Sequence, residues 1–180
     1  MVYVMMADGF EEIEALAVVD VLRRAGIDVF TVSITNKNTV TGAHKIQVIA
    51  DLTIKEAALE DADMIVLPGG MPGAQNLYDN PVLEEALEKR VKNNKWIAAI
   101  CAAPFIPGKR GYLKGKEAIC YPGFEKYLNG AIIKEQNVVI SDNFITSKGP
   151  GTALHFAFAI VSVLKDQKTA SELAKAMQIQ

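Results

Sequence analysis

The sequence predicts an α/β domain in which a parallel β-sheet is covered by helices on both faces. Short apolar segments alternate with segments of helical periodicity, which is the pattern of repeated strand–helix–strand units. The chain has 180 residues, the usual size of one domain, and shows no internal repeat, low-complexity tract or linker. We therefore expect residues 1–180 to form a single domain.

The predicted elements follow from apolar periodicity and from Gly, Pro and Asn as stop signals. In the first half we expect strands at residues 1–6 and 28–34, a buried strand at 64–67, a helix at 11–25, and a hairpin at 39–49 that bends at Gly42. A helix starting at Asn80-Pro81 should precede a strand at residues 96–100 and a short helix from Ala102 that Pro107-Gly108 cut short. Strands at 117–120, 138–141 and 144–146 and helices at 151–164 and 169–177 complete the chain.

Composition argues against several function classes. Nineteen basic and 21 acidic residues give a net charge of -2 without a basic run, so we do not expect nucleic acid as a partner. The N-terminus turns acidic after a short apolar run and lacks the features of a signal peptide, and the apolar stretches fall short of the ~20 residues that span a membrane. We expect a cytoplasmic protein with no membrane role.

Thiol chemistry is the chemistry that the residue types favour. Loops at the carboxyl ends of parallel strands form the usual binding site, and three such loops here contain residues 9–14, 68–73 and 101–104. Cys101 lies between a strand and a predicted helix, where the helix N-terminus lowers a thiol pKa and favours a nucleophilic thiolate. The alternative is that Cys101, surrounded by Ala and Ile, is only a small buried hydrophobic residue.

Several motifs together resemble one known family. They are Gly9-x-Glu11-Glu12-x-Glu14, residues 19–26 (VDVLRRAG), 66–70 (VLPGG), 73–77 (GAQNL), 98–102 (AAICA) and 147–152 (SKGPGT). This set closely resembles the ThiJ/PfpI superfamily, in the branch of the parkinsonism-associated deglycase (the DJ-1 branch), and extends from the first strand to the last helices. The resemblance implies a flavodoxin-like, doubly wound parallel sheet sandwiched between helices, as in class I glutamine amidotransferases, a homodimer, and a cysteine on a nucleophile elbow.

The resemblance also implies roles for individual residues. Glu14 corresponds to a carboxylic acid held protonated against the thiol, although a glutamate at a helix start can simply be exposed and favoured by the helix dipole. Backbone amides of Gly69, Gly70 and Ala102 are candidates for an oxyanion hole, while the glycines can equally serve only the turn.

Further candidate pocket residues are less specific. Tyr121 stands where the family often has a histidine, so a Cys–His pair is absent there. His44 aligns with an arginine that reaches a neighbouring subunit's site, and Arg24 and Lys148 match basic positions, yet all three can be merely solvated. His155 is most simply a helix residue. No Cys, His, Asp and Glu set has metal-ligand spacing, and we expect neither a metal nor another cofactor.

The resemblance therefore implies a cysteine-dependent, glutathione-independent enzyme of the stress response that acts on small reactive carbonyls, like a glyoxalase III or a deglycase. The alternative is a sensor in which peroxide oxidises Cys101, or a redox-regulated chaperone, without turnover. Cys120, the other cysteine, is not expected to take part.

Overall fold

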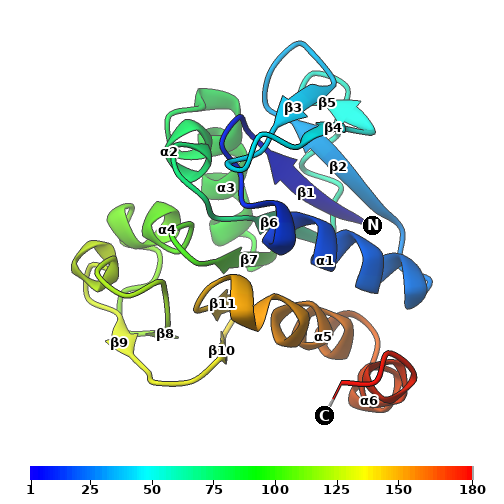
Figure 1. Cartoon of the computed structure of the whole chain (residues 1–180). Coiled ribbons are helices and arrows are strands. Elements are labelled where there is room, and N and C mark those ends of the chain that lie inside the picture. Colours follow the sequence, from blue (N-terminus) through cyan, green and yellow to red (C-terminus); the bar gives the residue numbers. More distant parts are fainter. Residues whose placement is uncertain (180) are drawn as a thin grey trace.

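The computed structural model describes residues 1–179 and has the predicted α/β architecture, a twisted sheet between two layers of helices (Figure 1). The seven-stranded sheet has the order β10-β11-β7-β6-β1-β2-β5. Its strands are β1 (Val2–Met6), β2 (Val29–Ser33), β5 (Leu52–Thr53), β6 (Met64–Leu67), β7 (Trp96–Ile100), β10 (Val138–Ser141) and β11 (Phe144–Ser147). Within the described residues, no helix is both long and apolar enough to cross a membrane.

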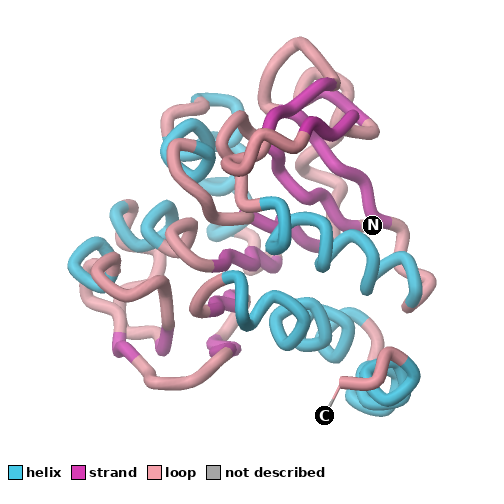
Figure 2. Tube along the Cα trace, viewed as in Figure 1, coloured by secondary structure: helices cyan, strands magenta, loops and turns pink. Residues whose placement is uncertain are grey.

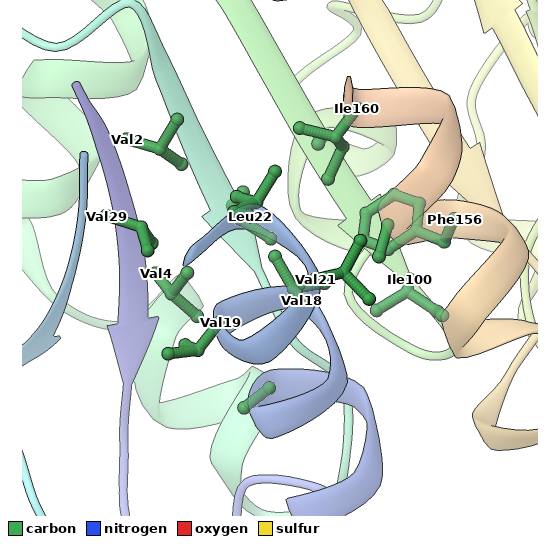
Figure 3. Packing of buried hydrophobic residues seen from close by; sticks show 14 of the residues in the cluster. Val2, Val4, Val18, Val19, Val21, Leu22, Val29, Ile100, Phe156 and Ile160 are labelled. Carbon is green, nitrogen blue, oxygen red and sulfur yellow. The ribbon is translucent and has the colours of Figure 1, made fainter. Parts of the chain in front are cut away.

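The helices cover the two faces of this sheet (Figure 2). They are α1 (Glu12–Arg24), α2 (Gly73–Tyr78), α3 (Pro81–Lys92), α4 (Phe105–Lys109), α5 (Ala153–Leu164) and α6 (Gln167–Ala176), with 3-10 turns η1 (Glu125–Tyr127) and η2 (Pro150–Thr152). Successive strand residues point to opposite faces, so each face has its own core. Val4 and Ile100 pack with α1 and α5 through Leu22 and Phe156, as Figure 3 shows, and the other face packs against α2, α3 and α4.

Two strand assignments differ from expectation. β10 is antiparallel to β11, because the two-residue turn Asp142-Asn143, with φ +50° at Asp142, can join only antiparallel strands. The segment 117–120 forms only the short β8 (Glu117–Ala118), which pairs outside the main sheet with β9 (Ile132–Ile133). The expected hairpin is present as β3 (Thr39–Thr41) and β4 (Gln47–Ile49), closed at Gly42.

The helix after the cysteine also differs from expectation. Residues 101–104 form turns, so α4 begins at Phe105 rather than at Ala102. It then runs through Pro107 and Gly108 to Lys109, although these residues were expected to end it. Pro107 is the third residue of α4, where a backbone N–H has no partner inside the helix, so proline removes no hydrogen bond there.

Arg90 is the largest fully buried side chain of α3 and ties this helix to the sheet. Its exposed fraction is 2%, and its guanidinium donates to the carbonyl oxygens of Leu59, Ala62, Asp63 and Trp96 at 2.9 to 3.3 Å. Burial lowers the pKa of Arg90 to about 10, because the charged guanidinium has lost most of its contact with water. The apolar stripe predicted for α3 therefore includes one arginine.

We predict that Arg90→Ala lowers the free energy of unfolding by about 3 kcal/mol, because four carbonyl groups lose a charged donor and a cavity forms. Urea denaturation measures this change. Lys92→Ala is the matched control, since the Lys92 side chain is 70% exposed and pairs only with Glu88 on the surface; it should change stability by less than about 0.5 kcal/mol. Equal effects of the two substitutions would contradict a structural role for Arg90.

Candidate active site

The site is built where β1, β6 and β7 end. These strands are adjacent and parallel, so their carboxyl ends meet at one edge of the sheet. The loop after β1 contacts the loop after β6 through backbone alone: Glu11 N–H donates to the carbonyl oxygen of Gly69 at 3.0 Å. A Cβ on Gly70, whose φ is +83°, would lie 2.5 Å from the backbone nitrogen of Glu11, so only glycine permits this approach.

Cys101 occupies the sharp turn predicted after β7. Its φ is +64°, a left-handed conformation that costs a non-glycine residue about 1–2 kcal/mol. Two backbone hydrogen bonds hold it there: Cys101 N–H donates to Ser147 O at 3.0 Å, and Tyr121 N–H donates to Cys101 O at 2.7 Å. The residue is 9% exposed, so the elbow presents a largely buried sulfur.

Glu14 is fully buried beside this sulfur. Its Oε2 accepts a hydrogen bond from Gly69 N–H at 2.7 Å, its Oε1 is buried without a hydrogen-bond partner among the described residues, and the carboxyl lies beside the Cys101 thiol. Burial raises the pKa of Glu14 from its ordinary value of 4.5 to about 7, and the neighbouring Cys101 thiol and Gly69 amide lower it less than burial raises it. Glu14 is thus not an exposed helix-start residue, although it lies in the first turn of α1.

The expected oxyanion donors divide into two groups. Gly69 N–H already donates to Glu14, so the expectation that Gly69 serves an oxyanion is wrong; its amide positions the carboxyl instead. The amides of Gly70 and Ala102 face the Cys101 sulfur, where they stabilise negative charge. These two N–H groups are the donors available to a charged sulfur or to an oxygen bonded near it.

The pKa of Cys101 is raised to about 12, first by burial and then by the negative charge of Glu14, while the Gly70 and Ala102 amides lower it. A pKa lowered by a helix N-terminus was therefore the wrong expectation, since α4 starts four residues later and burial dominates. The effect of Glu14 depends on its own state: a protonated Glu14 donates a hydrogen bond to the sulfur and favours thiolate. Ionisation of one of these two buried acids therefore opposes ionisation of the other.

The remaining candidates lie in three places. Tyr121 and Lys148 line a cavity of about 270 Å³, together with Pro122 and residues 149–152, and Tyr121 N–H is bonded to Cys101 O. Arg24 lies at the opposite end of α1 from Glu14, where it pairs with Asp20 at 2.7 Å, so this chain does not bring it to its own Cys101. His155 is an exposed residue of α5.

His44 is the exposed loop residue that was expected, with 67% of its side chain exposed, and it is also bonded to the start of α1. Its backbone N–H and its Nδ1 bond the two carboxylate oxygens of Glu12, each at 2.8 Å, and Glu12 is 5% exposed. The hydrogen bond to Glu12 and the charges of Glu11 and Glu12 raise the pKa of His44. Among residues 1–179, Glu11, Glu12 and His44 also group three potential metal-ligand atoms within 4.8 Å, which linear spacing could not show because His44 is far away in sequence.

We predict a pH-dependent stability that Glu14 controls. Because its pKa is raised in the folded state, the folded protein binds this proton more tightly, and the free energy of unfolding falls as pH rises from about 4.5 to about 7. The loss should be about 3 kcal/mol, which Glu14→Gln removes. Urea denaturation at pH 5 and pH 8 compares the two proteins; parallel pH dependences would show that Glu14 is not buried as an acid.

Comparisons with known proteins identify the family to which this chain belongs. The model of the DJ-1/PfpI family matches residues 1–163. Protein DJ-1 homolog B of Arabidopsis thaliana is 39% identical over 97% of this chain, which spans only 40% of that relative's length. The glutathione-independent glyoxalase DJR-1.2 of Caenorhabditis elegans is 36% identical over 92% of this chain and 88% of its own length. The solved structure of oxidized Toxoplasma gondii DJ-1 superposes with a TM-score of 0.94 at 35% identity, covering 99% of this chain and 97% of that one. The chain therefore belongs to the DJ-1/PfpI family.

Proposed function

We propose that this protein is a glutathione-independent enzyme that converts small 2-oxoaldehydes to hydroxy acids, with Cys101 as nucleophile. The observation that carries the proposal is the buried pair of Glu14 and Cys101, with the amides of Gly70 and Ala102 at the sulfur. This arrangement supplies a nucleophile, an acid that titrates near neutral pH and two donors for an oxyanion. The glyoxalase name of the Caenorhabditis elegans relative supports the same activity.

The proposed reaction begins with addition of the Cys101 thiolate to the aldehyde carbon of methylglyoxal. The carbon–sulfur bond forms, the carbonyl π electrons move to oxygen, and Glu14 supplies the proton that completes the hemithioacetal. Glu14 then moves a proton between the two substrate carbons through an enediol, which gives a thioester of lactate on Cys101. Water hydrolyses this thioester, which releases lactate and the thiol, and no external oxidant or reductant is consumed. Removal of early glycation adducts from proteins would use the same first addition.

We predict lactate formation from methylglyoxal without added glutathione, and its loss to background in Cys101→Ser, since a hydroxyl lacks the nucleophilicity of a thiolate. Enzymatic detection of lactate measures both. Cys120→Ala is the matched control because Cys120 is also buried, at 1% exposure, and makes no contact in the proposed chemistry; its activity should stay within about twofold of wild type. Turnover that survives in Cys101→Ser would assign the reaction to another group.

A second candidate function is peroxide sensing by the same cysteine. The solved Toxoplasma gondii relative is described as oxidized, and here the amides of Gly70 and Ala102 and a protonated Glu14 could hold the oxygens of a sulfinate on Cys101. A folded protein that gains two oxygens on Cys101 with hydrogen peroxide, by mass spectrometry, but turns over no aldehyde would favour the sensor.

We also propose that the chain forms a homodimer through α1 and the hairpin. Ile13 and Leu16 on α1 are 58% and 36% exposed, and Ile46 in the hairpin loop is 55% exposed. The bond from His44 to Glu12 holds that loop against the start of α1, so these apolar side chains belong to one surface region. Apolar side chains gathered on an otherwise charged surface are typical of an interface.

We predict a dimer in size-exclusion chromatography with light scattering, and a monomer for Ile13→Glu, because an unpaired charge would have to be buried in the interface. Val82→Glu is the control, since Val82 is similarly exposed, at 51%, on the distant helix α3. A monomeric wild type, or a dimer that survives Ile13→Glu, would rule out this surface.

A further inference from the structure

The cavity beside the elbow has two walls, and each is bonded directly to the nucleophile residue. Tyr121, in one wall, donates its backbone N–H to Cys101 O at 2.7 Å. The other wall begins at Lys148, next to Ser147, whose carbonyl accepts Cys101 N–H at 3.0 Å. These two backbone bonds place the cavity beside Cys101, although the side chain of Cys101 does not itself line it.

The lining of this cavity is apolar and flat. Tyr121 is 46% exposed, so part of this large aromatic residue is open to a bound group. Pro122 and Pro150 add two rigid rings, and no carboxylate of the described chain lines the space. Lys148 lies at the rim, where its alkyl stem can cover apolar surface while the ammonium stays in water.

Gly149 sets the width of the cavity next to the aromatic ring. A Cβ on this residue would lie 3.3 Å from Cδ2 of Tyr121, so a side chain there would push the ring or fill the space in front of it. The backbone of Gly149 is extended, with φ 166°, a conformation open to any residue. Glycine at position 149 therefore leaves room for the Tyr121 ring.

We propose that this cavity is a subsite for the substituent of the 2-oxoaldehyde and that it selects a large, flat, apolar group, so that aryl glyoxals are better substrates than methylglyoxal. An aryl ring can stack on Tyr121 and contact the two prolines, whereas a methyl group leaves most of about 270 Å³ unfilled. The inference rests on the proposed carbonyl activity and specifies its substrate class.

The test compares kcat/KM for phenylglyoxal, followed as mandelate, with kcat/KM for methylglyoxal, followed as lactate. The wild-type ratio should exceed about ten, the factor that corresponds to stacking one aromatic ring. Tyr121→Ala, which removes the stacking surface, and Gly149→Ala, which narrows the cavity while keeping the ring, should each lower the ratio about fivefold or more. Phe30→Ala removes an aromatic side chain of similar exposure, 37%, on β2 away from the site, and should leave the ratio at its wild-type value.

The outcomes separate the subsite from the activity itself. Cys101-dependent turnover of methylglyoxal with a ratio near one, unmoved by Tyr121→Ala and Gly149→Ala, would overturn the subsite and leave the carbonyl activity standing. If a folded protein turns over neither aldehyde, the proposed activity fails, and calorimetric titration of Cys101→Ser with mandelate and lactate decides on the subsite. Tighter binding of mandelate, weakened by Tyr121→Ala, would support the subsite, and equal or absent binding of both acids would reject it.

Discussion

The hydrogen bond between Gly69 N–H and the buried carboxyl of Glu14 is the interaction on which the rest of the site depends. It exists because β1 and β6 are parallel neighbours, with Val2 opposite Met64, so the loops that follow them leave the sheet side by side. A carboxyl with no exposed surface is costly unless it is neutral or well bonded, and here Oε2 is bonded to a backbone amide while Oε1 has no partner among the described residues. Burial therefore raises the pKa of Glu14 to about 7, where the carboxyl can both donate and accept a proton.

The strained elbow extends this arrangement to the next strand. Cys101 keeps a left-handed backbone only because the end of β11, at Ser147, and the loop at Tyr121 each bond its peptide groups. The same two segments form the walls of the adjacent cavity. The position of the sulfur and the shape of the space in front of it are therefore fixed by one set of contacts, and a substitution that loosens either wall should act on the nucleophile as well.

Apolar periodicity was enough to predict the sheet and most helices, because it reports which face of an element is buried. It could not assign polar partners across the sequence. The bond between Glu12 and His44 joins residues 32 positions apart, and the amide of Gly69 looks like that of Gly70 until Glu14 is seen to occupy it. Arg90 could not be recognised for a related reason: a charged residue inside an apolar stripe is expected to be exposed, yet here carbonyl oxygens from two segments, residues 59–63 and Trp96, accept hydrogen bonds from it.

The chemistry that this site can support follows from which of its two buried acids, Glu14 or Cys101, holds a proton. With Tyr121 in place of a histidine, no imidazole of residues 1–179 acts on the sulfur, so Glu14 is the group placed to exchange protons with a substrate bound there. When the sulfur adds to a carbonyl, its negative charge passes to an oxygen near the Gly70 and Ala102 amides, and a neutral Glu14 can protonate that oxygen. The resulting carboxylate then faces a neutral thioether instead of a thiolate and keeps its hydrogen bond from Gly69 N–H. Addition therefore converts Glu14 from an acid into the base that the next step requires.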